Sequence, residues 1–153
     1  MSRERPTLRE ATAADLPGIS RVRTSVRENL LTVEQLRERG ITNESVAASL
    51  LADSKGWVAE REGEIVAFAI ADRASQSIFA LFVLPDCEDQ GLGSGLLDLA
   101  LRWLAENGAA AVWLTTGQDT KAAAFYERRG WVRTGRGQHG DARYEFELSG
   151  SRT

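Results

Sequence analysis

The chain contains few of the residues that build metal centres and covalent cross-links. Its 153 residues include a single cysteine, Cys87, and a single histidine, His139. One cysteine excludes an intramolecular disulfide, and one histidine excludes a cluster of histidine metal ligands. No histidine is suitably spaced from Cys87 to activate its thiol as a nucleophile. We therefore expect no metal site, and we interpret Cys87 as a bystander and His139 as a turn residue.

Long apolar runs and an excess of positive charge are also missing. No apolar run approaches the roughly 20 residues that cross a bilayer, and the segment from Met1 to Pro6 lacks the apolar region of a secretory signal. The formal net charge is −3, with the basic residues scattered among acidic ones. Nucleic acid favours clustered Lys and Arg instead. These features predict a cytoplasmic protein without a membrane or nucleic-acid partner.

What the chain does contain is the composition of one folded domain. Its hydrophobic residues make up 42% and its charged residues 27% of the sequence, and its length matches a domain of about 100–150 residues. Internal repeats and low-complexity segments are absent from the sequence. We expect one domain over residues 1–153, with an ordered core over 6–149.

Hydrophobic periodicity changes along the chain between the spacing of helices and that of strands. It predicts strands over residues 6–10, 57–60, 65–70, 77–84, 111–115, 131–134 and 142–148. It predicts helices over residues 15–29, 32–39, 43–52, 93–107 and 120–129, the first of them capped by Asp15. The continuously apolar segment 77–84 suggests a strand buried on both faces. The order indicates an α/β (α+β) fold, a mixed sheet with helices packed on it.

Three glycines at alternate positions, Gly91, Gly93 and Gly95, connect an apolar strand to the long helix that follows. The free amide groups at a helix start and the helix dipole favour an anion there, and glycine lets a phosphate approach the backbone. The turn lacks the Gly-Lys-Ser/Thr of a Walker loop. It also lacks a dinucleotide fingerprint, because Leu96 stands where the third glycine would be. An anion site and a turn without a ligand both remain compatible with this segment alone.

The segment around this turn resembles the pyrophosphate loop of GNAT-type N-acetyltransferases, which reads Gln/Arg-x-x-Gly-x-Gly/Ala after a buried strand. Gly91 and Gly93 match the two small positions. Glu88 stands where Gln or Arg is usual, and Asp89 stands where Gly is common. Both departures bring carboxylates near an anionic ligand, although most phosphate contacts in the family come from backbone amides.

A second segment, residues 119–131, resembles the family signature Asn-x-x-Ala-x-x-Phe/Leu-Tyr-Glu-x-x-Gly-Phe. The matching residues are Ala122, Phe125, Tyr126, Glu127, Gly130 and the aromatic Trp131. Asp119 replaces the usual Asn and still offers an N-cap acceptor. Two motifs about 30 residues apart, with a strand between them, are more specific together than either is alone.

The resemblance implies a GNAT-like domain whose sheet is mostly antiparallel, with helices on both faces and a splayed central strand pair. It also implies that acetyl-CoA donates an acetyl group to an amine by direct attack in a ternary complex. The implied cofactor-binding residues are Leu81, Phe82, Val83, Glu88, Asp89, Gln90, Gly91, Leu92, Gly93, Ser94, Asp119 and Tyr126. The resemblance also implies a bulge at residues 81–83, which would splay this strand from its neighbour. One N–H group of the bulged strand would polarise the thioester carbonyl.

Catalytic roles are implied for Tyr126, beside the coenzyme sulfur, and for a base that deprotonates the amine. Arg27, Glu28 and Asn29 end the first predicted helix, where the acceptor pocket of the family begins. We therefore expect these three to bind substrate and Glu28 to be the leading base. The remaining candidate bases are His139, Asp141 and Glu145.

The acceptor class is open on sequence grounds. A small-molecule amine and a peptide amine are both compatible with the motifs, and a homodimer is one state open to such a domain. One alternative is a non-catalytic acyl-CoA-binding or sensing module, which Glu88 favours and Tyr126 opposes. Another is an antitoxin-like or scaffolding partner, which the glycine turn opposes.

Overall fold

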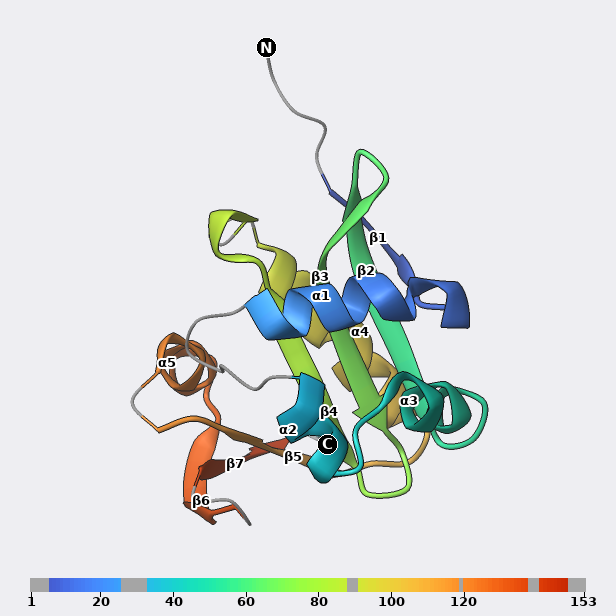
Figure 1. Ribbon diagram of the computed structural model, residues 1–153. Coiled ribbons are helices and arrows are strands. Elements are labelled where there is room, and N and C mark those ends of the chain that lie inside the picture. Colours follow the sequence, from blue (N-terminus) through green and yellow to red (C-terminus); the bar gives the residue numbers. More distant parts are fainter. Residues whose placement is uncertain (1–5, 26–32, 88–90, 119, 138–140, 149–153) are drawn as a thin grey trace.

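A computed structural model describes residues 6–25, 33–87, 91–118, 120–137 and 141–148. Within these ranges the strands form one seven-stranded sheet in the order β1-β2-β3-β4-β5-β7-β6 (Figure 1). Neighbouring strands are antiparallel except for β4 and β5, which are parallel. The strands are β1 Thr7–Glu10, β2 Ser54–Arg61, β3 Glu64–Asp72, β4 Ser77–Val83, β5 Ala111–Thr116, β6 Val132–Arg136 and β7 Ala142–Glu147.

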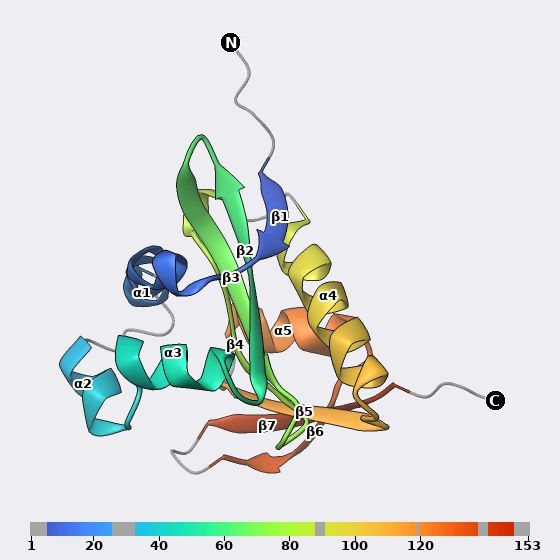
Figure 2. The same cartoon turned by 90° about the vertical axis from the view of Figure 1, so that its right-hand side faces the viewer.

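Helices cover both faces of the sheet. Figure 2 shows α1 and α3 on one side of the central strands and α4 on the other. The α-helices are α1 Leu16–Ser25, α2 Val33–Glu38, α3 Asn43–Leu50, α4 Leu92–Glu106 and α5 Lys121–Arg128, and two short 3₁₀ helices are η1 Ala13–Asp15 and η3 Pro85–Cys87. The mixed, mostly antiparallel sheet with helices on both faces is confirmed. Within the described ranges, no helix combines the length and apolarity needed to span a bilayer.

Alternation along β3 divides the core into two layers. Phe68 and Ile70 belong to the apolar cluster under α1 and α3, whereas the small Ala67, Ala69 and Ala71 belong to the cluster under α4. Successive side chains of a strand point to opposite faces, so one strand supplies both layers. The long helix α4 thus packs against alanines, while α1 packs against larger side chains.

The central pair β4 and β5 is splayed. Among the described residues the two strands share one register pair, Ser77 with Trp113, so their later residues do not pair. On the other side of β4, Ala71 pairs with Ile78 while Ile70 pairs with Ala80. Phe79 is therefore an extra, bulged residue, two positions before the segment in which the sequence analysis expected the bulge.

The expected burial of residues 77–84 on both faces is wrong for Phe79 and for the second half of the segment. Phe79 is 46% exposed, and Leu81, Phe82 and Val83 are only partly buried. The reason is the splayed pair. Beyond Ser77 no strand among the described residues pairs with β4 on its β5 side, and these side chains line an open groove.

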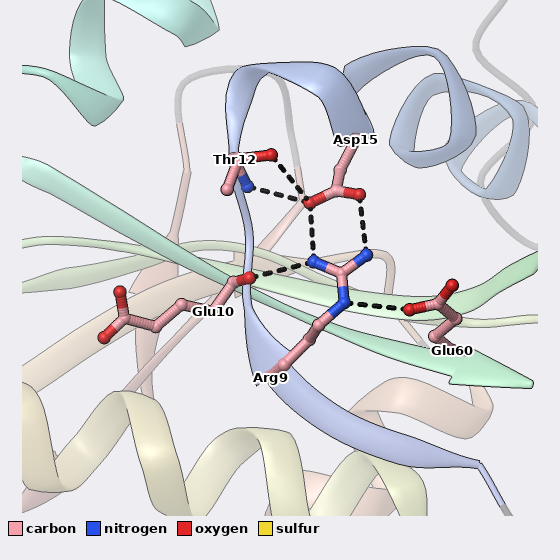
Figure 3. A network of polar contacts seen from close by, with 5 residues as sticks. All are labelled: Arg9, Glu10, Thr12, Asp15 and Glu60. Carbon is pink, nitrogen blue, oxygen red and sulfur yellow. Dashed lines mark hydrogen bonds and ion pairs between the residues drawn. The ribbon is translucent and has the colours of Figure 1, made fainter. Parts of the chain in front are cut away.

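The start of α1 differs from the expectation that Asp15 caps it. Thr12 is the N-cap of η1, and its N–H donates to the Asp15 carboxylate over 2.8 Å. Arg9 donates two hydrogen bonds of 2.9 Å to that carboxylate and one of 2.8 Å to Glu60 (Figure 3). The hydrogen bonds from Arg9 hold the pKa of Asp15 below its usual range, against the opposing effect of burial. This network joins β1, η1 and β2 and fixes where α1 begins.

The start of α5 also differs from expectation. Its N-cap is Thr120, whose hydroxyl oxygen accepts a hydrogen bond from the Ala123 N–H at 3.1 Å. Asp119, expected as the cap, lies outside the described residues. Threonine and aspartate both favour N-caps, so the sequence pattern alone could not separate two adjacent candidates.

Candidate functional site: a groove between the splayed strands

A groove with a volume of about 930 Å³ opens where β4 and β5 diverge. It runs along β4, past the start of α4, over α5 and to the ends of β5 and β7. It is lined by all the expected cofactor-binding residues that the structure describes: Leu81, Phe82, Val83, Gly91, Leu92, Gly93, Ser94 and Tyr126. Two motifs that are separate in the sequence therefore meet in one cavity.

Several expected site residues lie outside the described residues, and the structure does not place them. They are Glu88, Asp89, Gln90 and Asp119 of the cofactor set, Arg27, Glu28 and Asn29 of the acceptor set, and His139. Of the other candidate bases, Asp141 lines the groove. Glu145 instead accepts a hydrogen bond from Arg143 at 3.3 Å and is absent from the described groove lining.

The three glycines of the turn differ in how well a side chain would fit at each position. Gly91 is the N-cap of α4 and has a φ of 77°, a left-handed conformation that side chains disfavour. A Cβ on Gly93 would meet Phe125 at 3.5 Å and Val83 at 3.9 Å, which is ordinary contact. A Cβ on Gly95 would approach Leu8 to 2.8 Å, so Gly95 permits close packing of α4 on β1. Only Gly91 and Gly93 line the groove.

Tyr126 is 4% exposed and lines the groove from α5. Its ring makes edge contacts with Phe125 and Trp131, at centroid distances of 5.2 and 5.4 Å. Burial raises the pKa of Tyr126 above its ordinary value. The hydroxyl is therefore protonated at neutral pH and can donate a hydrogen bond into the cavity.

Three cations of α5 and its C-cap line the same groove, namely Lys121, Arg128 and Arg129. Arg129 hydrogen-bonds the Ser94 hydroxyl and its guanidinium carbon lies 4.0 Å from the ring centroid of Phe125. Sequence reasoning missed these residues because basic and acidic side chains alternate there. Their helical spacing, with Phe125 between them, was the available signal, since residues 121, 125, 128 and 129 share one helix face.

The single cysteine also lies beside the groove but is poorly suited to nucleophilic attack. Cys87 is fully buried, and burial raises the pKa of its thiol. A protonated thiol is a weak nucleophile, because the thiolate is the reactive form. In the part of the chain that the structure describes, no group of three or more His, Cys, Asp or Glu side chains could hold a metal ion.

Comparison with known proteins places the chain in a family. The model of the acetyltransferase (GNAT) family matches residues 22–131, and the chain belongs to this family. That range contains β2 to β5, α4, α5 and both motifs of the groove. The resemblance inferred from the sequence is confirmed.

The curated relatives are similar over part of their length. A mycothiol acetyltransferase of Streptomyces coelicolor is 36% identical over 81 residues, which are 50% of this chain and 26% of that protein. One from Streptomyces griseus is 35% identical over 86 residues, which are 52% of this chain and 28% of that protein. The matched region thus spans about a quarter of each relative.

Solved structures are similar over almost the whole chain. PaiA N-acetyltransferase of Thermoplasma acidophilum, in complex with coenzyme A, has a TM-score of 0.79 at 15% identity and covers 97% of this chain and 100% of its own. YncA of Salmonella typhimurium, with acetyl-CoA, has a TM-score of 0.75 at 16% identity and covers 98% of each chain. At such identities the likeness shows the fold.

Proposed function

We propose that this acetyltransferase moves an acetyl group from acetyl-CoA to an amine by direct attack in a ternary complex. One observation carries the proposal: the groove between β4 and β5 contains the glycine turn at the start of α4 and Tyr126 of α5 in a single cavity. Family membership supports acetyl transfer in general. The bound coenzyme A and acetyl-CoA of the two structural neighbours support the donor.

The charge distribution of the groove suits the phosphates of acetyl-CoA. Free N–H groups of the first turn of α4 and the positive end of its dipole favour an anion. Lys121, Arg128 and Arg129 add three cations to the lining, against which Asp141 is the one acid among the described lining residues. We expect the pyrophosphate at Gly91 to Ser94. The carboxylates of Glu88 and Asp89 would then be offset by the cations of α5.

The unpaired side of β4 suits the remainder of the donor. Beyond Ser77 the backbone of β4 has no partner on the β5 side among the described residues. The pantetheine arm contains amides and can pair there as an added strand would. An N–H group near the Phe79 bulge can then donate to the thioester oxygen as negative charge develops on it.

Tyr126 is proposed to act at the departing sulfur. The thiolate of an ordinary thiol, with a pKa of about 8.5, is a weaker base than the buried Tyr126 phenolate. Tyr126 therefore stabilises the thiolate by donating a hydrogen bond and keeps most of its own proton. The attacking amine loses its proton to a base, and the carbon–sulfur bond breaks as the amide bond forms.

Two carboxylates are proposed as alternatives for that base. Glu28 is the sequence candidate. Asp141 lines the groove, and its Oδ1 is buried without a hydrogen-bond partner among the described residues. Glu28→Gln and Asp141→Asn test them separately. Losing the base should slow the reaction most at low pH, with recovery as the free amine deprotonates in solution.

The decisive experiment measures thiol release from acetyl-CoA across a panel of amines, amino acids and peptides. We expect release that depends on the acceptor, together with acetylated product. Tight acetyl-CoA binding with no product from any acceptor would contradict the proposal and favour the non-catalytic sensing module. The protein without acceptor is the control, because direct attack forms no acetyl-enzyme.

A further inference from the structure

Arg23 of α1 is a buried cation without a described partner. It is 7% exposed, and its guanidinium carbon lies 5.4–5.7 Å from the ring centroids of Phe68, Phe79 and Phe82. Its Nε is buried with no hydrogen-bond acceptor, and no described oxygen accepts from its other nitrogens. The aromatic rings attract the positive charge. They leave the planar array of N–H donors available to a ligand.

Arg23 borders two cavities. Its side chain lines the groove and also a second cavity of about 260 Å³ between α1, α2 and α3. Apolar side chains, including Leu16, Ile19 and Val46, form part of that second cavity. Figure 2 shows α1 on the face of the sheet opposite α4, so Arg23 lies across the sheet from the glycine turn.

Leaving an arginine in this state costs stability. Burial lowers the pKa of Arg23 to about 10, and no charge among the described residues counters that effect. Buried charges in proteins are usually paired, because moving a charge out of water is costly. A bound anion would supply the missing partner. The guanidinium fork fits a carboxylate through two parallel hydrogen bonds.

We propose that Arg23 binds the carboxylate of the acetyl acceptor, so that the substrate class is small amines that also carry a carboxylate. This inference rests on the proposed acetyl transfer and narrows it. The acceptor enters on the α1 face and places its carboxylate at Arg23, while its amine reaches the thioester on β4. An apolar side chain on the acceptor fits the second cavity.

The test compares acceptors that differ only in the carboxylate. Thiol release from acetyl-CoA is measured with L-leucine, L-leucinamide and 3-methylbutylamine, then with the other common amino acids and their amides. Wild-type protein should prefer the acids. In Arg23→Met, kcat/KM for the acids should fall about 10–100-fold, mainly through KM, because a hydrogen-bonded charge is lost. Rates with the neutral amines should stay within about twofold, and Arg23→Lys should lie between wild type and Arg23→Met.

Arg21 provides the matched control on the same helix. Its guanidinium donates to the Ile65 carbonyl at 2.6 Å, and it is exposed. Arg21→Met should keep the preference for acids. Thermal unfolding and coenzyme A affinity of each variant show that the fold and donor site are intact. Arg23→Met should unfold at or above the wild-type temperature, whereas an arginine kept for structure would lower it.

Three results would overturn the inference while acetyl transfer stands. They are equal rates with acids and amides, an equal loss for all acceptors in Arg23→Met, or a preference for O-phosphoethanolamine over every carboxylate. Absence of thiol release with every amine, charged or neutral, would instead contradict the proposed function itself.

Discussion

Arg9 lies in β1, shortly before α1, and Arg23 lies within α1, yet the surroundings of the two side chains differ. Arg9 is 38% exposed and donates hydrogen bonds to Asp15, Glu60 and the Glu10 carbonyl. Arg23 is far more buried and has no such partner among the described residues. The more buried cation is the less satisfied one. The environment of Arg9 is therefore that of a structural residue, whereas the environment of Arg23 is that of the proposed ligand-binding residue.

The same contrast separates the two halves of the groove. On the donor side, the glycine turn and α5 offer backbone amides, exposed cations and a tyrosine, most of which belong to motifs of the family. On the proposed acceptor side, the buried Arg23 lies among three phenylalanines, and Arg39 also lines the groove. The proposed donor half thus contains the two motifs that resemble the family, and the proposed acceptor half contains Arg23.

Removing the Tyr126 hydroxyl should reduce activity more than any other change considered below. Tyr126→Phe keeps the ring packed against Phe125 and Trp131 and removes the donor to the thiolate. We expect kcat to fall about 10²–10³-fold, as when one hydrogen-bond donor to a developing anion is removed, with acetyl-CoA affinity nearly unchanged, as measured by steady-state kinetics and calorimetry. Because burial raises its pKa, Tyr126 should impose no alkaline loss of rate below about pH 10. A variant as fast as wild type would make Tyr126 a packing residue.

A larger side chain at Gly93, on the proposed donor side of the groove, should weaken coenzyme A binding by an intermediate amount. The backbone there tolerates a Cβ, so Gly93→Val should fold and place its methyl groups against the groove wall. We expect coenzyme A affinity to fall about tenfold or more, equivalent to about 1.4 kcal/mol. Gly135→Ala on β6 is the control, because its Cβ would meet no described atom within 4 Å and it lies outside the described groove lining. If the folded Gly93→Val variant bound coenzyme A with unchanged affinity, the proposed location of the donor at this turn would be contradicted.

Disrupting the Arg9 network should change stability and leave catalysis intact. Asp15→Asn should lower the free energy of unfolding at pH 7 by about 1–2 kcal/mol, by weakening a charged cap. Since the folded pKa of Asp15 is lowered, its contribution is present above its unfolded pKa of about 3.9 and is lost as pH falls through the folded pKa. Urea unfolding at several pH values should therefore show the two curves converging in acid. A constant gap would contradict this role.

The fold was largely predictable from the sequence, because hydrophobic periodicity and glycine positions are local signals. Glu62 and Gly63, between the predicted strands 57–60 and 65–70, have φ values of 54° and 82° and connect β2 to β3. The glycine turn was likewise found at the start of α4. The bulge was predicted at residues 81–83, and the structure has it at Phe79. A bulge depends on the register of β4 against β3, which no local sequence pattern specifies.

From the sequence, motifs indicated residues on the proposed donor side of the candidate site only. Motif residues gave Gly91, Gly93 and Tyr126, which the structure gathers in one groove. Arg23 could not be found in this way. Its burial arises from rings on β3 and β4 that are distant in the sequence, and a lone arginine in a helix ordinarily indicates a solvated face.

The central claim is that the donor occupies the groove between β4 and β5. Hydrogen exchange measured with and without saturating acetyl-CoA tests this claim most directly. The account predicts slower exchange of backbone amides in Phe79–Val83 and Leu92–Ser94 when acetyl-CoA is present. Amides of α3, on the opposite face, should exchange unchanged. Equal exchange in both groove segments, under conditions where calorimetry shows acetyl-CoA bound, would contradict the account.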